Sequence, residues 1–153
     1  MGKKVSEVMS AEPTTVKRST AIRLAAELMS REDVGSLPVV EETGELVGIV
    51  TDRDIVVRVI AAGHDIDAVQ VGEILTAQPV SVSPDDPLDD AMERMAYYRV
   101  RRLPVVIDMQ LVGVLAQADV AQEAKDKQAG QVLEAISQDS SDQAESVGAR
   151  ARG

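Results

Sequence analysis

The stretch Leu37-Pro38-Val39-Val40 recurs 66 positions later as Leu103-Pro104-Val105-Val106. The matching register continues beyond it: after the loss of one residue in a turn, Leu46-Val47-Gly48 matches Leu111-Val112-Gly113. Self-similarity at a fixed spacing is the signature of a repeated structural unit. The chain therefore contains two copies of one unit.

Each copy predicts the same order of elements, namely an extended piece, a helix, two strands and a second helix. Apolar residues recur at helical spacing from Ile22 and again from Leu88, and the two apolar strands of each copy flank a short polar turn. In copy one the segments are 13–16, a helix from Ile22, 37–40, 46–50, and a helix from Asp54 to about Ala62 that ends at Gly63. In copy two they are 79–82, a helix from Leu88, 103–107, 111–115, and a helix from Asp119 to about Ala129 that ends at Gly130.

This order predicts an α+β fold in which each copy forms a small sheet with helices on one face. A unit of this size buries too little surface to be stable alone, so we expect the copies to pack sheet to sheet about a pseudo-two-fold axis. We assign 5–63 to the first repeat, 64–72 to a linker and 73–130 to the second repeat. We expect the C-terminal extension, 131–153, to be a largely disordered tail because it has few apolar residues.

The composition excludes several classes of protein. The 153 residues include no cysteine and one histidine, so thiolate zinc sites, disulfides and cysteine nucleophiles are excluded and a metal centre is not expected. The sequence offers no set of nucleophile, acid and base, and therefore no catalytic residues and no enzyme. A net charge of −10 argues against nucleic-acid binding, and no apolar run reaches the roughly 20 residues of a membrane helix. We expect a cytoplasmic protein.

The segment Thr51-Asp52-Arg53-Asp54 follows the second strand of copy one and opens a helix. A hydroxyl and a carboxylate three residues apart lie on one side of the first helical turn. A carboxylate there can accept two hydrogen bonds from the paired hydroxyls of a ribose. The same two side chains can instead simply cap the helix. Residue spacing alone leaves both interpretations open.

Two tandem copies, each with a Leu-Pro-Val-Val strand, together with Gly48-Ile49-Val50-Thr51-Asp52-Arg53-Asp54, resemble a CBS-domain pair, also called a Bateman module. The resemblance covers most of the chain, from about Val5 to Gly130, and is greatest with the small bacterial proteins that consist of such a pair. It implies that Thr51 and Asp54 form a ribose-binding motif that faces the other copy. It also implies base contacts from Ile49, Pro79, Val80 and Val100, and phosphate contacts from Arg53, Arg101 and Arg102.

The two copies differ at these positions. Arg99, Arg101 and Arg102 form a basic cluster in copy two, whereas copy one has Gly35-Ser36 at the matching place. Copy two in turn has Ala116-Gln117-Ala118-Asp119 in place of the Thr51 motif, so the hydroxyl is missing. We therefore expect one better site and one weaker site, the weaker one formed by Asp119, Val114, Pro13, Thr14 and Val34.

The resemblance implies a regulatory module that binds an adenosine-containing ligand, such as AMP, ADP or ATP, between the repeats. Because no other domain is fused to it, the module would act on a separate protein target in trans. CBS pairs commonly associate through their helices, so a homodimer is expected. The alternative is a ligand-free structural or protein–protein interaction module that dimerises through its helices. Neither function requires a cofactor.

Overall fold

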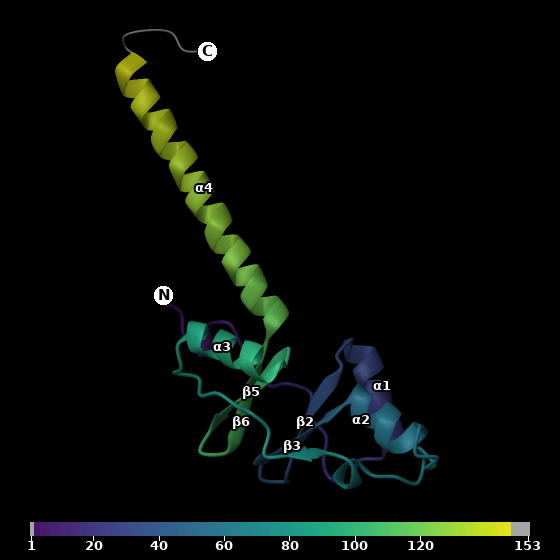
Figure 1. Ribbon diagram of the computed structural model, residues 1–153. Helices are drawn as coiled ribbons and strands as arrows, with labels where there is room; N and C mark the ends of the chain where they lie inside the picture. Colours follow the sequence, from purple (N-terminus) through teal and green to yellow (C-terminus); the bar gives the residue numbers. More distant parts are fainter. Residues whose placement is uncertain (1, 148–153) are drawn as a thin grey trace.

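The computed structural model describes the backbone of residues 2–147 and the side chains of residues 2–136. Figure 1 shows two halves side by side and one long helix, α4, that projects away from them. Each half contains a three-stranded sheet and helices. The predicted α+β fold with two related halves is confirmed.

The two halves repeat the same elements. The first half contains α1 (Ile22–Glu32), β2 (Ser36–Val40), β3 (Leu46–Thr51), α2 (Asp52–Ile55) and a π-helix, η2 (Val56–Ile60). The second half contains α3 (Leu88–Tyr98), β5 (Arg102–Ile107), β6 (Gln110–Ala116) and α4 (Gln117–Val147). In both halves, the two long strands form an antiparallel hairpin.

The third strand of each sheet comes from the other copy. β1 (Ser10–Ala11) pairs with β6, and β4 (Thr76–Ala77) pairs with β3, so the sheet orders are β1-β6-β5 and β2-β3-β4. This exchange was not predicted, because sequence periodicity shows where strands lie but not which strand each one pairs with. Two short 3₁₀ helices, η1 (Val5–Glu7) and η3 (Val71–Glu73), precede the exchanged strands.

Each hydrophobic core also contains residues from the other copy. Val5, near the start of the chain, is fully buried in the core of the second half, whereas Val71 and Ile74 are buried in the core of the first half. Both cores consist of aliphatic residues and methionine, since the chain has no Phe and no Trp. The hairpin turns of the two halves also meet, through hydrogen bonds from Leu46 N to Met109 O (2.9 Å) and from Leu111 N to Gly44 O (3.2 Å).

The extended pieces before α1 and α3 are confirmed as extended but pair very little. Each makes a single parallel bridge, Val16 with Val39 and Val82 with Val105. Ser19, Thr20 and Asp86 are of the residue types that often cap a following helix, but none of them caps α1 or α3. Neither helix has a side-chain cap. Thr20 Oγ1 and Asp86 Oδ2 instead accept hydrogen bonds from the backbone of Lys17 and Ser83, because a turn three residues earlier competes for them.

The prediction that Gly130 ends the last helix was wrong. Gly63 has φ +80° just after η2, which is the left-handed conformation that suits a helix end, but Gly130 stays helical and α4 continues to Val147. A single glycine inside a helix costs about 1 kcal/mol relative to alanine, which does not break the helix. The helix thus includes 131–147, part of the extension that the sequence predicted to be largely disordered; 148–153 lie outside the described residues.

Two equivalent glycines allow the exchanged strands to approach closely. A Cβ atom added at Gly48 would lie 2.6 Å from Thr76 O in β4, and one added at Gly113 would lie 2.8 Å from Ser10 O in β1. Both contacts are with backbone atoms, which cannot rotate away as a flexible side chain can. The two glycines are therefore required by the exchange of strands.

We predict that Gly48→Ala and Gly113→Ala each lower the free energy of unfolding by about 1–3 kcal/mol, the usual cost of overpacking. Urea denaturation followed by circular dichroism measures this change. Gly130→Ala is the matched control, because a Cβ there meets no atom within 4 Å and alanine favours the helix. Equal stability of Gly48→Ala and the unchanged protein would contradict the close approach.

Candidate functional site

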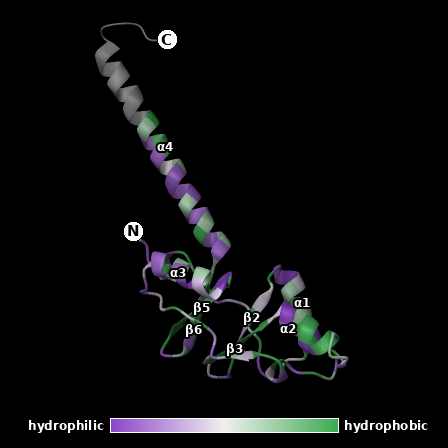
Figure 2. Ribbon diagram, in the orientation of Figure 1, coloured by the Kyte–Doolittle hydropathy of each residue, from purple (hydrophilic) through white to green (hydrophobic). Residues whose placement is uncertain are grey.

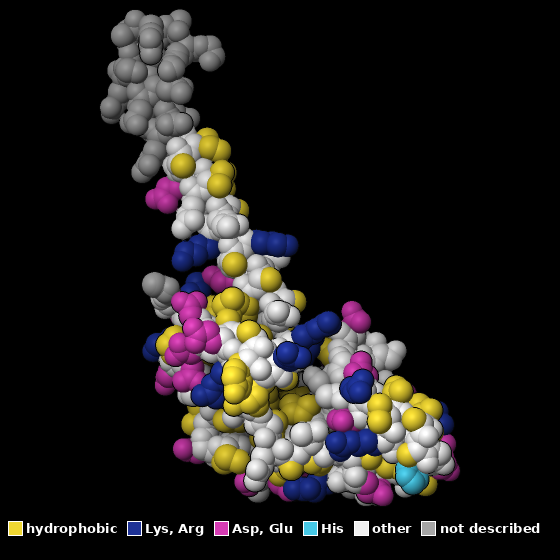
Figure 3. Space-filling model, viewed as in Figure 1, with side chains coloured by type: hydrophobic (Ala, Val, Ile, Leu, Met, Phe, Trp, Pro, Cys, Tyr) yellow, Lys and Arg dark blue, Asp and Glu magenta, His cyan; other side chains and the backbone are white. Residues whose placement is uncertain are grey.

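A cleft of about 1220 Å³ lies between the two halves. Figure 3 shows it as a hollow with apolar side chains inside it and dark blue basic side chains at its rim. Its walls come from β3 and the start of α2 on one side and from β5 and the preceding turn on the other. The segment after β4 and the first turn of α4 complete the lining.

The structure brings most of the predicted site residues together in this cleft. The residues of the predicted better site that line it are Ile49, Thr51, Arg53, Pro79, Val80, Val100, Arg101 and Arg102. Asp54, the second residue of the predicted ribose motif, does not line it. Residues from both repeats thus face one space, as the pseudo-two-fold arrangement predicted.

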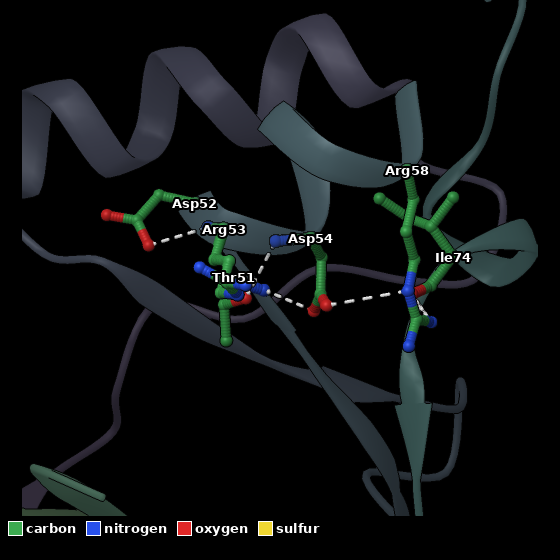
Figure 4. A network of polar contacts seen from close by, with 6 residues as sticks. All are labelled: Thr51, Asp52, Arg53, Asp54, Arg58 and Ile74. Atoms are coloured by element: carbon green, nitrogen blue, oxygen red, sulfur yellow. Dashed lines mark hydrogen bonds and ion pairs between the residues drawn. The ribbon is translucent and has the colours of Figure 1, made fainter. Parts of the chain in front are cut away.

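Thr51 and Asp54 form a capping box at the start of α2 (Figure 4). Thr51 Oγ1 accepts a hydrogen bond from Asp54 N, and Asp54 Oδ2 accepts one from Thr51 N, both at 3.0 Å. Such reciprocal bonds satisfy backbone groups that a helix start leaves unpaired. The capping interpretation of these two residues is therefore observed. It leaves the second oxygen of Asp54, and the O–H donor and one lone pair of the Thr51 hydroxyl, open to further bonds.

Asp54 also faces Arg58, one turn further along the helix. Arg58 Nε lies 3.8 Å from Asp54 Oδ1, and Arg58 Nη1 donates a hydrogen bond to Ile74 O at 2.9 Å. The Asp54 side chain is 13% exposed. Sequence reasoning missed Arg58, although the spacing of four residues between an acid and a base on a helix was a readable signal. Arg58 thus connects the predicted ribose motif to the segment that enters β4.

A basic rim, which we define as Arg53, Arg99, Arg101 and Arg102, surrounds the cleft. Arg99 ends α3 with φ +57°, in the left-handed region. Among the ion pairs found within residues 2–136, none involves these four arginines. Asp33 and Asp52 also line the cleft, which leaves an excess of two positive charges in a chain of net charge −10. Such a local field attracts anions.

The sequence did not assign Tyr98 to the site, yet it lines the cleft. It is 52% exposed and meets Tyr97 edge to face, with ring centroids 4.9 Å apart. Gln117 and Ala118, from the first turn of α4, also line the cleft, although they stand at the positions of the missing second ribose motif. Tyr97 and Tyr98 are the two aromatic residues of this chain, and this scarcity was the sequence signal that could have drawn attention to Tyr98.

A second, smaller cavity of about 170 Å³ contains most of the predicted weaker site. Pro13, Thr14, Val34 and Val114 line it, and Asp119 does not. Asp119 instead lies exposed in the first turn of α4. Val34 borders both cavities.

Neither a cluster of metal ligands nor a membrane-spanning helix occurs in the part of the chain that the structure describes. Among the described residues, there is no group of three or more histidine, cysteine, aspartate or glutamate residues that could hold a metal ion. Nor does any helix among them combine the length and the apolar character needed to cross a membrane.

The family comparison matches this architecture. The model of the CBS domain matches residues 5–61 and again 71–126. The CBS domain-containing protein YhcV of Bacillus subtilis is 40% identical over 134 residues, which cover 87% of this chain and 94% of YhcV. Hypoxic response protein 1 of Mycobacterium tuberculosis is 32% identical over 130 residues, which cover 85% of this chain and 91% of that protein.

Solved structures with the same fold include ligand complexes. The structure of Hypoxic Response Protein I with two coordinated zinc ions has a TM-score of 0.73 at 32% identity and covers 78% of this chain and 98% of its own. CBSX2 in complex with AMP has a TM-score of 0.74 at 30% identity, with 83% and 99% covered. The CBS pair of MJ0100 in complex with 5′-methylthioadenosine and S-adenosyl-L-methionine has a TM-score of 0.72 at 28% identity, with 82% and 98% covered.

These similarities span nearly the whole length of the related proteins, and the family model matches both repeats. The chain therefore belongs to the CBS-domain family and is a tandem CBS pair.

Proposed function

We propose that this CBS pair is a regulatory module that binds an adenosine nucleotide in the cleft between its repeats. The observation that carries the proposal is the convergence on one cleft of Thr51 from the first repeat and of Arg99, Arg101 and Arg102 from the second. A CBS pair of the same fold is known in complex with AMP, and another in complex with S-adenosyl-L-methionine and 5′-methylthioadenosine. Both observations favour a ligand that contains adenosine.

The chemistry of the cleft suggests how each part of the ligand lies. The base packs among Ile49, Pro79, Val80 and Val100, which are partly buried apolar residues. The ribose hydroxyls bind Thr51 on the cleft wall and Oδ1 of Asp54. Asp54 does not itself line the cleft, but its side chain is 13% exposed and the long contact to Arg58 leaves Oδ1 able to accept a hydrogen bond. The phosphate meets Arg53, Arg101 and Arg102, since guanidinium groups bind phosphate in a two-pronged geometry.

The positive charge of the cleft favours phosphorylated ligands over neutral or cationic ones. S-adenosyl-L-methionine carries a sulfonium cation, which the basic rim would repel. A zinc ion, as in Hypoxic Response Protein I, is also disfavoured, because this chain has no cysteine and one histidine. AMP, ADP and ATP thus remain the best matched class.

Ligand binding across two repeats couples their positions. A ligand that binds one relative orientation more tightly shifts the population toward it, and a partner in trans can detect the change. The alternative function is a ligand-free interaction module, which the complete capping box of Thr51 and Asp54 favours, because both residues already have a structural role. The two functions differ in whether nucleotide changes the stability of the protein.

We predict that AMP raises the melting temperature, because a ligand at 100 times its dissociation constant adds about 2.7 kcal/mol of stability. Asp54→Asn keeps the shape and one acceptor oxygen for the cap but loses the charge, and should weaken AMP binding about tenfold or more. Asp119→Asn, at the matching position of the other repeat, is the control and should leave affinity unchanged. Differential scanning fluorimetry and calorimetric titration measure both effects. The proposal fails if AMP, ADP and ATP all leave the melting temperature unchanged.

A second prediction isolates the phosphate contact. Arg101→Ala should weaken AMP binding about tenfold or more and leave adenosine binding nearly unchanged, because only the phosphate faces the arginine. Arg31→Ala, an exposed arginine outside the cleft, should change neither affinity. Isothermal titration with both ligands tests this difference. An equal loss of AMP and adenosine affinity in Arg101→Ala would place the phosphate elsewhere.

We also propose that the protein forms a homodimer through its first-half helices. Leu24, Val56, Val57 and Ile60 are 46–59% exposed, and Figure 2 shows apolar residues gathered where α1 and α2 lie side by side. An apolar patch of this kind on a small protein is typical of an interface. A second copy, related by two-fold symmetry, would cover it without leaving the same patch open.

Val57→Glu should shift the protein from dimer to monomer in light scattering coupled to size-exclusion chromatography, because a buried unpaired charge opposes association. Ile107→Glu, an equally exposed apolar position on a hairpin, should leave the dimer intact. A dimer that persists in Val57→Glu and dissociates in Ile107→Glu would move the interface to the hairpins.

A further inference from the structure

The carboxylate of Asp54 is held from two sides, as Figure 4 shows. Its Oδ2 accepts the hydrogen bond from Thr51 N within the capping box, and its Oδ1 lies 3.8 Å from Arg58 Nε. At that distance the guanidinium attracts the carboxylate without forming a hydrogen bond, so Oδ1 keeps its lone pairs. The oxygen that is able to accept a bond from a ligand is therefore fixed in direction before any ligand arrives.

Arg58 is itself anchored to the segment that leads into the exchanged strand β4. Its Nη1 donates a hydrogen bond to Ile74 O at 2.9 Å, and Ile74 is buried in the core of the first half. The same segment continues through β4 to Pro79 and Val80, which line the cleft. Arg58 therefore joins the Asp54 carboxylate of one repeat to the segment of the other repeat that lines the apolar part of the cleft.

The second repeat makes the corresponding connection with the charges reversed. Glu123 stands at the position that matches Arg58, and its Oε1 lies 2.8 Å from Nζ of Lys3, in the segment that leads into β1. Both connections tie a helix to an exchanged segment of the other copy. They differ at the aspartate one turn earlier, because Asp54 has a basic residue beside it whereas Asp119 is followed at the same spacing by the acidic Glu123. Arg58 thus has a role toward its aspartate that Glu123 cannot have.

We propose that Arg58 is a positioning residue that gives the cleft its preference for a ribose over a sugar without hydroxyl groups. This inference rests on the proposed function, because it concerns the ribose-binding part of the same site. Arg58 does not line the cleft, so it acts through Asp54 and not on the ligand. By fixing the direction of Oδ1, it presents the ribose hydroxyls with an acceptor that loses little conformational freedom on binding.

Calorimetric titration with AMP and with 2′,3′-dideoxy-AMP tests this role, because the second ligand keeps the base and the phosphate but has no ribose hydroxyls. We expect the unchanged protein to bind AMP at least about tenfold more tightly than the dideoxy compound, since the hydroxyls bond to a charged group. Arg58→Gln should reduce this ratio about threefold or more, and should change the affinity for 2′,3′-dideoxy-AMP less than about twofold. Circular dichroism melts establish that the variant folds.

Two further variants show whether the effect passes through Asp54. In a protein that already carries Asp54→Asn, adding Arg58→Gln should not reduce the ratio further, because the two residues act as one unit. Glu123→Gln is the matched control: it breaks the corresponding connection of the second repeat and should leave the ratio unchanged.

Equal losses of affinity for AMP and for 2′,3′-dideoxy-AMP in Arg58→Gln would overturn the inference, since a purely structural residue affects both ligands alike. A ratio that falls as far in Glu123→Gln as in Arg58→Gln would overturn it too. An unchanged protein that binds neither nucleotide would count against the proposed function itself. An unchanged protein that binds both equally well would leave the nucleotide function standing and overturn the role of Arg58.

Discussion

The structure depends on the exchange of one short strand between two repeats. β1 completes the sheet of the second half, β4 completes the sheet of the first, and each of these strands is only two residues long. These short strands nevertheless position much of the structure. Val5, which precedes β1, is buried in the core of the second half, and the residues that follow β1 and β4 line the two cavities. Gly48 and Gly113 are the points at which this arrangement would fail first, since both strands lie against them. Neither repeat has a complete sheet or a complete core without the other.

The exchange explains why the two cavities are composite, and sequence divergence between the repeats explains why they differ. The segment after each exchanged strand lies opposite the hairpin of the other repeat, so each cavity contains residues from both. With identical repeats the two sites would be equivalent. Here the arginines after α3 replace Gly35 and Ser36, while the threonine of the predicted ribose motif is present only after β3. Both changes favour the same cleft, which is why the charge and the hydroxyl group meet there.

Most of the fold and of the cleft could be predicted from the sequence because the repeat supplies long-range information. The match of Leu37-Pro38-Val39-Val40 to its copy relates distant segments. The resemblance to CBS pairs assigned Thr51, Arg101 and Arg102 to one site, and all three line the same cleft. The exchange of strands could not be predicted from the sequence, because Ser10 is equally compatible with pairing to either hairpin. The end of α4 was misjudged because Gly130 resembles Gly63, and only the backbone angle distinguishes a helix stop from a helical glycine. Asp54 lies behind Thr51 rather than on the cleft wall because the capping box turns its carboxylate toward the backbone.

The exchanged strands also set an order for the assembly of the protein as it leaves the ribosome. The first repeat can close its sheet and core once Val71, Ile74 and β4 have emerged. β1, although made first, has its partner at Val114 in β6, so it waits while most of the chain is synthesised. Pairings between residues so distant in sequence form slowly, and domains fold in the order in which they are made. The N-terminal segment is thus the last part of the sheets to be fixed, and its arrival completes the second half.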